Sequence, residues 1–173
     1  MNGGADDHVG GVTNVVLAGL GGQGVIKASD ILADAALRAG FDVKKAEVHG
    51  MSQRGGSVTS DIRFGAKVLS PMVPCGEADF LVVLAASEVE VARPLLRPGG
   101  VLLSPDLVPE PALPNKRSLN VALLGTLSVY LDIPAETLLA AVRAALPERL
   151  HAVNERAFVL GRTLAAQQVK MMR

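Results

Sequence analysis

The sequence predicts an α/β fold in which a mostly parallel sheet is covered by helices. Two short apolar runs, residues 14–18 (NVVLA) and 80–85 (FLVVLA), have the composition of parallel strands that are buried on both faces. The first run leads through glycines into residues 25–39, where apolar side chains recur at helical spacing. A strand, a helix and a further strand in this order require a right-handed crossover in a parallel sheet.

The first crossover has clear boundaries. Ile31, Leu32 and Ala35 fall on one face of the predicted helix, and Gly40 is a suitable stop. Residues 41–48 then predict the second strand.

An antiparallel hairpin is expected to interrupt the parallel order. Residues 57–64 alternate between a more apolar and a polar face, and a Gly-Ala turn follows them. Residues 67–73 can return as the partner strand. Pro71 and Pro74 cannot donate to a ladder, so they favour an edge position or an early end of this strand.

The C-terminal half predicts short connections and then helices. After the 80–85 strand, Ser87 is a candidate N-cap and Glu90 occupies the capping-box position. Four prolines make residues 105–114 a loop. The other predicted elements are a helix at 87–96, a strand at 101–103, and helices at 121–131, 135–146 and 154–168. The whole pattern predicts a Rossmann-like three-layer sandwich with C-terminal helices.

Length and composition fit one domain. With 173 residues and a hydrophobic fraction of 49%, the chain can bury a core of Val, Leu, Ala and Ile. Residues 1–12, rich in Gly and Asp, predict a flexible tail without signal-peptide features, and residues 13–173 predict the domain. A net charge of +0 provides no field that attracts nucleic acid or an acidic membrane, and no apolar run reaches the ~18 residues of a membrane span.

Cys75 is the only cysteine. A single thiol forms no internal disulfide and cannot supply the roughly four ligands of an Fe–S cluster or a structural zinc. We expect a structural residue, because a nucleophilic role would need a nearby base. The sequence therefore predicts no metal site in this chain and a reduced, cytoplasmic setting.

The first candidate site is the glycine cluster between the first strand and the first helix. It consists of Gly19, Gly21, Gly22, Gln23 and Gly24. The pattern G-x-G-x-x-G in this context allows a phosphate to approach the helix N-terminus, and Glu47 lies near the place of the acidic residue in a dinucleotide site. However, Gly22 makes the loop unusually bare, and Gln23 can direct its amide to a neighbouring chain. A phosphate site, a partner-facing loop and a structural turn all stay open.

The second candidate site follows the second strand and combines a carboxylate, an imidazole, an amide and a guanidinium with glycines. Its residues are Glu47, His49, Gly50, Met51, Gln53, Arg54, Gly55, Gly56 and Ser57. Arg54 could hold a carboxylate or phosphate through two hydrogen bonds at an interface, or be solvated on a surface loop. His49 could act as an acid or base near neutral pH, or be structural.

Four strings carry a resemblance to a known family: GLGGQG, EVHGMSQRGGSV, SPMVPCGEADFLVVL and RPGGVLL. Over residues 14–161 the chain resembles the small subunit of indolepyruvate:ferredoxin oxidoreductase and, more broadly, the gamma subunit or domain of 2-oxoacid:ferredoxin oxidoreductases, which act on pyruvate and ketoisovalerate. The string HGMSQRGGSV is the specific part of this resemblance.

The resemblance implies an oxidative decarboxylation, in which a 2-oxoacid and coenzyme A give an acyl-CoA and CO2 while ferredoxin receives the electrons. It implies that thiamine diphosphate with Mg and the Fe–S clusters are carried by a larger partner subunit in a hetero-oligomer. The chain also lacks a G-D-G motif with the following Asn of a thiamine diphosphate site. This subunit is therefore expected to be inactive alone, without a catalytic residue of its own, and to shape a substrate or coenzyme A site at an interface.

Two other functions stay open. The first glycine cluster together with Glu47 also fits a stand-alone protein that binds NAD(P) or FAD. A regulatory protein that keeps the fold but has lost the complex is the third possibility.

Overall fold

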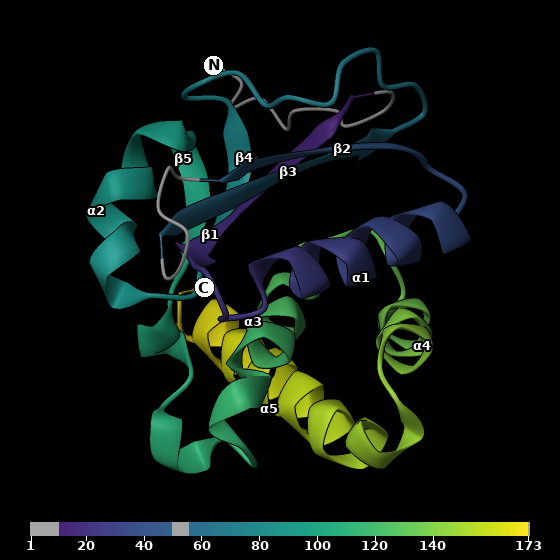
Figure 1. The fold of residues 1–173 in the computed structure, drawn as a ribbon, viewed down its shortest axis with the longest axis vertical. Helices are drawn as coiled ribbons and strands as arrows, with labels where there is room; N and C mark the ends of the chain where they lie inside the picture. Colours follow the sequence, from purple (N-terminus) through teal and green to yellow (C-terminus); the bar gives the residue numbers. More distant parts are fainter. Residues whose placement is uncertain (1–10, 50–55, 173) are drawn as a thin grey trace.

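The computed structural model describes residues 11–49 and 56–172, and five strands of this part form one sheet (Figure 1). The order across the sheet is β2-β3-β1-β4-β5. The strands are β1 (Thr13–Leu20), β2 (Asp42–His49), β3 (Ser57–Gly65), β4 (Ala78–Val83) and β5 (Leu96–Leu103). With the helices described below, the sheet confirms the predicted α/β class.

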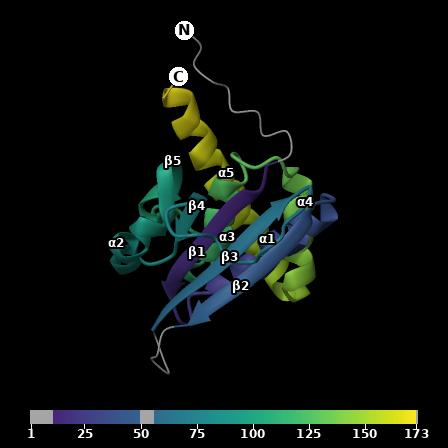
Figure 2. The ribbon, with the colours of Figure 1, turned by 90° about the horizontal axis from the view of Figure 1, so that it is seen from above.

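Strand β3 makes the sheet mixed. Strands β1, β4 and β5 are parallel, whereas β3 is antiparallel to both of its neighbours, β1 and β2. Figure 2 shows β3 lying between them. An antiparallel hairpin is thus present, but its partners are β2 and β3. The predicted pairing of residues 57–64 with residues 67–73 is wrong.

Residues 67–73 form no strand, and side chains bind backbone groups that a ladder would use. The carboxylate of Asp42 accepts a hydrogen bond from the amide of Val68 at 2.7 Å. That of Asp61 accepts one from the amide of Val73 at 2.9 Å. These two contacts hold the segment against the end of the hairpin and occupy donors that strand pairing would need.

Helices cover the two faces of the sheet unequally. One face carries α1 (Val25–Arg38), α3 (Leu119–Leu127), α4 (Ala135–Ala145) and α5 (His151–Met171) (Figure 1). The short helix α2 (Val89–Ala92) packs on the other face, beside β4 and β5. The three predicted layers are therefore present, with one thick and one thin helical layer.

Alternate side chains of β1 enter two separate cores. Val15 and Leu17 pack beneath the four longer helices. Val16 and Ala18 point to the opposite face, where Ala92 of α2 joins them. Because both faces are buried, the strand is apolar without interruption from Val15 onward, as its sequence indicates.

Helix α3 is buried around nearly its whole circumference, since every residue from 120 to 127 is buried. It crosses α5 where Gly125 and Gly161 meet the opposite helix. A Cβ atom on Gly125 would overlap the carbonyl oxygen of Phe158, and one on Gly161 would overlap that of Ala122. The two glycines therefore permit the close approach of the helices.

The predicted helix 87–96 is present as a continuous helical segment over residues 86–95, but only its centre is α-helical. Helix α2 is a single turn between two 3-10 turns, and Ser87 lies inside the first of these without capping α2. Glu90 instead pairs with Arg93, with Oε1 and Nη2 2.7 Å apart. Pro94 follows directly and cannot extend the helix, because its ring excludes a helical hydrogen bond.

Other boundaries differ by a few residues. Strand β5 begins at Leu96, earlier than the predicted 101–103, and α3 ends at Leu127, before the predicted end at 131. In the described ranges, no helix combines the length and apolarity needed to cross a membrane.

Candidate ligand and partner site

The two glycine clusters lie at one edge of the sheet. Strand β1 ends there at Leu20, opposite Ser57, and β2 ends at His49, opposite Val58. The backbone amide of Gly21 donates a hydrogen bond of 3.0 Å to the carbonyl oxygen of Gly56. Segments more than 30 residues apart in sequence are thus joined directly.

The first cluster forms a tight turn from β1, which contains Gly19, into α1. Gly22 and Gly24 have φ angles of 86° and 82°, in the left-handed region that side chains disfavour. Gln23 folds inward: its Oε1 accepts from the amide of Leu20 at 2.7 Å, and its Nε2 donates to the carbonyl oxygen of Leu84 at 3.5 Å. In this structure the Gln23 amide closes the turn and does not extend toward a neighbour.

Two open cavities flank the N-terminus of α1. One, of about 500 Å3, extends from the first glycine cluster to Arg117 and Asn120. The other, of about 390 Å3, extends from the same cluster to Lys27 and His49. Basic side chains beside a helix N-terminus suit an anionic group.

The larger cavity is also shaped by the start of α3. Asn120 Nδ2 donates to the carbonyl oxygen of Gly24 at 3.2 Å, which fixes the turn against this helix. Lys116 lines the cavity too, but it pairs with Glu110. Arg117 forms no ion pair with any described residue, so it is the cation that this cavity offers most directly.

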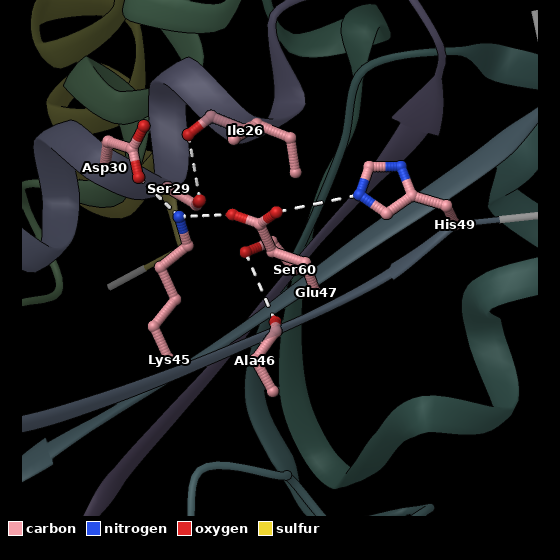
Figure 3. Close-up of polar contacts among 8 residues, drawn as sticks. All are labelled: Ile26, Ser29, Asp30, Lys45, Ala46, Glu47, His49 and Ser60. Carbon is pink, nitrogen blue, oxygen red and sulfur yellow. Dashed lines mark hydrogen bonds and ion pairs between the residues drawn. The ribbon is translucent and has the colours of Figure 1, made fainter.

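Glu47 belongs to a chain of charged contacts (Figure 3). Lys45 pairs with both Asp30 of α1 and Glu47, and Glu47 Oε2 lies 3.6 Å from His49 Nε2. The hydrogen bond from Lys45 holds the pKa of Glu47 below its usual range. Partial burial lowers the pKa of Lys45, but the hydrogen bonds to the two carboxylates outweigh it and keep this pKa above its usual range.

The position of Glu47 differs from that of the ribose-binding acid in a dinucleotide site. In that fold the acidic residue ends a strand adjacent to the first strand. Here β3 lies between β1 and β2, so Glu47 is two strand spacings, roughly 10 Å, from β1. Its carboxylate already binds Lys45. This geometry does not favour NAD(P) or FAD binding.

Ser57 is engaged within the protein. Its Oγ donates a hydrogen bond of 2.7 Å to Oε2 of Glu88, a buried carboxylate in the turn before α2. The start of β3 is thereby tied to the segment that follows β4. Five predicted residues, Gly50, Met51, Gln53, Arg54 and Gly55, lie outside the described residues.

Sequence reasoning missed Glu88, Arg117 and Asn120. Asn120 carries a usable signal, because it is a single amide in an otherwise apolar helix and such a residue must find a buried partner. For Arg117 the signal is the preceding Asn115, a residue type that often caps helical turns. Its side chain accepts a hydrogen bond of 2.9 Å from the amide of Arg117 and caps the turn before α3. Neither signal identifies the glycine turn as the element that α3 contacts.

The described residues contain no group of three or more His, Cys, Asp or Glu side chains placed to hold a metal ion. Cys75 is exposed, and its Sγ lies 3.5 Å from the carbonyl oxygen of Pro94. Because this is the only cysteine of the sequence, the chain does not fit a site for an Fe–S cluster of four thiolates.

Comparison with known proteins gives matches over most of the chain. The sequence model of the pyruvate ferredoxin/flavodoxin oxidoreductase family matches residues 14–114. Indolepyruvate oxidoreductase subunit IorB of Thermococcus kodakarensis is 35% identical over an alignment that covers 86% of this chain and 93% of that protein. IorB of Pyrococcus horikoshii is 33% identical, with 91% and 98% covered.

Solved structures of 2-oxoacid:ferredoxin oxidoreductases have a similar fold. The gamma subunit of a keto/oxoacid ferredoxin oxidoreductase from Geobacter sulfurreducens superimposes with a TM-score of 0.75 at 26% identity, covering 90% of this chain and 99% of that chain. The 2-oxoglutarate:ferredoxin oxidoreductase of Magnetococcus marinus, solved with 2-oxoglutarate, coenzyme A and succinyl-CoA bound, has a TM-score of 0.77 at 24% identity. It matches over 90% of this chain and 31% of that chain, and supports the fold alone.

The resemblance inferred from the four sequence strings is confirmed by these matches. Relatives that align over nearly their whole length are subunits of oxidoreductase complexes. The chain therefore belongs to the pyruvate ferredoxin/flavodoxin oxidoreductase family.

Proposed function

We propose that this chain is the small, cofactor-free subunit of a thiamine diphosphate-dependent 2-oxoacid:ferredoxin oxidoreductase. The complex would oxidise indolepyruvate or a related 2-oxoacid to an acyl-CoA and CO2, in the cytoplasm. Residues 13–173 would act as one domain, with residues 1–12 as a tail. The near full-length similarity to IorB subunits favours this branch of the family.

One observation carries the proposed role: both glycine clusters lie at the same edge of the sheet and are joined through Gly21 and Gly56. Two open cavities and the N-terminus of α1 lie at that edge. Small residues there let a partner or ligand approach the backbone closely. We infer that this edge forms one wall of a substrate or coenzyme A site that a larger subunit completes.

The expected cofactors of the complex are thiamine diphosphate with Mg, Fe–S clusters and coenzyme A as co-substrate. The proposal assigns the first three to the larger subunit, because this sequence has one cysteine and no G-D-G motif. Ferredoxin would exchange electrons with that subunit and contact this chain only indirectly.

The chain's own residues would bind and orient. Arg117 and His49 line the two cavities beside the N-terminus of α1, where an anion such as a carboxylate or a phosphate is stabilised. Glu47 would orient the His49 ring, since Oε2 of Glu47 lies 3.6 Å from Nε2 of His49.

Purification from the native host tests the proposal directly. We expect the chain to co-purify with a large subunit that carries thiamine diphosphate and Fe–S clusters. Recovery of the chain only as a free protein would contradict it. Calorimetric titration of the isolated chain with NADH, NADPH and FAD provides the opposing test, and tight binding of any of them would favour the stand-alone alternative.

Substitutions in the assembled complex test the wall itself. His49→Ala and Arg54→Ala are expected to raise the KM for coenzyme A or the 2-oxoacid, or to weaken assembly, without loss of the fold. Arg156→Ala, an exposed position on α5 that lines neither cavity, is the matched control for charge removal. Unchanged kinetics and unchanged assembly in both test variants would remove the role proposed for this edge.

A further inference from the structure

A third cavity lies at the opposite edge of the sheet from the glycine clusters. Its volume is about 180 Å3, and it includes Thr13, where β1 begins, and Gly65, where β3 ends. The segment between α3 and α4 contributes Tyr130 and Asp132 to its lining. The cavity is therefore separate from the site proposed above.

This cavity gathers the aromatic residues of the chain. The sequence has four Phe and one Tyr, and all of them except Phe158 line the cavity. Phe41 and Phe64 form one pair, with ring centroids 5.4 Å apart. Phe80 and Tyr130 form a second pair at 6.0 Å. In a chain with so few aromatics, two ring pairs beside one small space concentrate aromatic surface there.

Three charged side chains line the cavity, and one of them, the carboxylate of Asp132, is not part of an ion pair among the described residues. Arg97 also lines the cavity, but its Nε lies 2.7 Å from Oδ1 of Asp79, so this pair is neutral as a whole. The second oxygen of Asp79 accepts from the amide of Asn14 at 2.8 Å. Asp132 is exposed and forms no ion pair within the described part of the chain. The cavity thus offers aromatic rings and one unpaired negative charge.

We propose that this cavity binds a small organic cation, an alkylated ammonium or a guanidinium group. Such a cation is attracted to the faces of Phe and Tyr rings within about 6 Å and is further stabilised by a carboxylate. The volume fits one group of side-chain size, since a cavity of about 150 Å3 holds a benzene ring and drug-sized ligands need about 300 Å3 or more. The group can belong to a free metabolite or to an Arg or Lys side chain of a partner.

Tyrosine fluorescence reports on this cavity selectively, because Tyr130 is the only Tyr and the chain has no Trp. The full chain is titrated with tetramethylammonium chloride, with sodium chloride at matched ionic strength, with neutral tert-butanol and with benzoate. We expect a saturable change with tetramethylammonium alone. An equal response to tert-butanol would show a merely apolar cavity, and a preference for benzoate would show that Arg97 sets its charge. Either result, or no response at all, overturns the proposal.

Two variants keep the reporter and separate the contributions. Asp132→Asn is expected to weaken tetramethylammonium binding by about two- to fivefold, the range that exposed ion pairs contribute. Phe80→Leu keeps apolar volume and removes one ring face, and we expect a weakening of about threefold or more. Asp106→Asn, an exposed carboxylate outside the cavity, is the control and should bind as the wild type does. Unchanged affinity in Asp132→Asn, which is exposed and should fold normally, refutes the charge argument even if Phe80→Leu is unstable.

The assembled complex distinguishes the two sources of the cation. The subunit is labelled with 3-fluorotyrosine, so that 19F NMR observes position 130 in the presence of other chains. If tetramethylammonium no longer shifts the signal in the complex, and assembly itself has already shifted the signal in the same direction, a cationic side chain of the partner occupies the cavity. Loss of the response without that shift shows that the partner only covers the cavity, and it contradicts a partner source of the cation. If the shift persists with the affinity of the free chain, the cavity serves a free cation.

Discussion

At the scale of single residues, the carboxylate of Glu88 near the glycine-lined edge accepts a hydrogen bond from the side chain of Ser57. This carboxylate is buried, and Ser57 Oγ donates to it at 2.7 Å. Removing a donor from a buried carboxylate leaves a desolvated acceptor, whereas removing both groups costs much less.

We therefore expect Ser57→Ala to lower the free energy of unfolding by about 1–3 kcal/mol. Urea denaturation of the isolated chain measures this. Ser57→Thr keeps the hydroxyl and should remain close to the wild type. A loss as large in the Thr variant as in the Ala variant would show that the site responds to shape and not to the hydrogen bond.

Asp61 is a second buried carboxylate, and its burial raises its pKa above the usual value of 3.8, against the opposing effects of the Val73 amide and Arg63. Because the folded protein holds the proton of Asp61 more tightly than the unfolded chain does, the contribution of this carboxyl to stability is fully present below its unfolded pKa. The contribution is lost as the pH rises through the folded pKa. Asp61→Asn can still accept from Val73. The stability of Asp61→Asn relative to the wild type should therefore increase with pH across the acid range and then level off. Urea curves at several pH values measure this, and a difference that stays constant with pH would contradict it.

Local sequence patterns predicted the backbone of the glycine turn better than the side-chain contacts around it. The glycines at 22 and 24 adopt the positive φ angles that a tight strand-to-helix turn needs, in keeping with the predicted turn. The pairing of Glu47 with Lys45 follows from the alternation of β2, which places both on the face toward α1, but the contact of Lys45 with Asp30 depends on how α1 packs. Such contacts are long-range consequences of tertiary packing, and local spacing does not encode them.

At the scale of elements, the crossing of α3 and α5 tolerates no side chain at its two glycines. A Cβ on Gly161 would overlap the carbonyl oxygen of Ala122, which is backbone and cannot rotate away. The helices would have to separate, although α3 is buried on nearly all sides.

We expect Gly161→Ala to lower the free energy of unfolding by about 1–3 kcal/mol, despite the better helix propensity of alanine. Thr163→Ala, at an exposed position of the same helix, is the control and should be neutral or slightly stabilising. Thermal denaturation of both variants checks this, and a Gly161→Ala protein that is more stable than the wild type would show that the crossing is not tight.

The hairpin shows where element prediction fails. The period-two pattern of residues 57–64 correctly predicted a strand, and its antiparallel direction was also correct. The partner was wrong because the pattern of one strand does not specify which neighbour it pairs with. Strand β2 lacks a fully apolar run, since Lys44 and Lys45 lie in it. It is the outermost strand of the sheet, where charged side chains prevent pairing with a further strand.

At the scale of the whole molecule, the site lies at one end of the strands, where α1 and α3 of the main helical layer begin, whereas α4 lines neither of its cavities. Assembly with a larger subunit is expected to slow amide hydrogen exchange about tenfold or more at residues 21–25 and 56–58, because these amides lie at the proposed wall. The amides of α4 should exchange as in the free chain. Exchange mass spectrometry of the free and assembled subunit measures both regions. If assembly slows exchange in α4 and leaves exchange at residues 21–25 and 56–58 unchanged, the partner binds at α4 and not at the proposed wall.

The uneven helical layers have a consequence for the synthesis of the protein on the ribosome. The face of the sheet that carries Leu17, Ile62 and Leu103 is covered in part by α3 and by Phe158 of α5. All five strands are translated before these helices. The stretch from Leu103 to Phe158 takes roughly 3 to 11 seconds to translate at 5–20 residues per second. During that interval the nascent sheet exposes apolar surface, so a chaperone that binds apolar segments has its best opportunity on chains that have passed β5 and not yet reached α5.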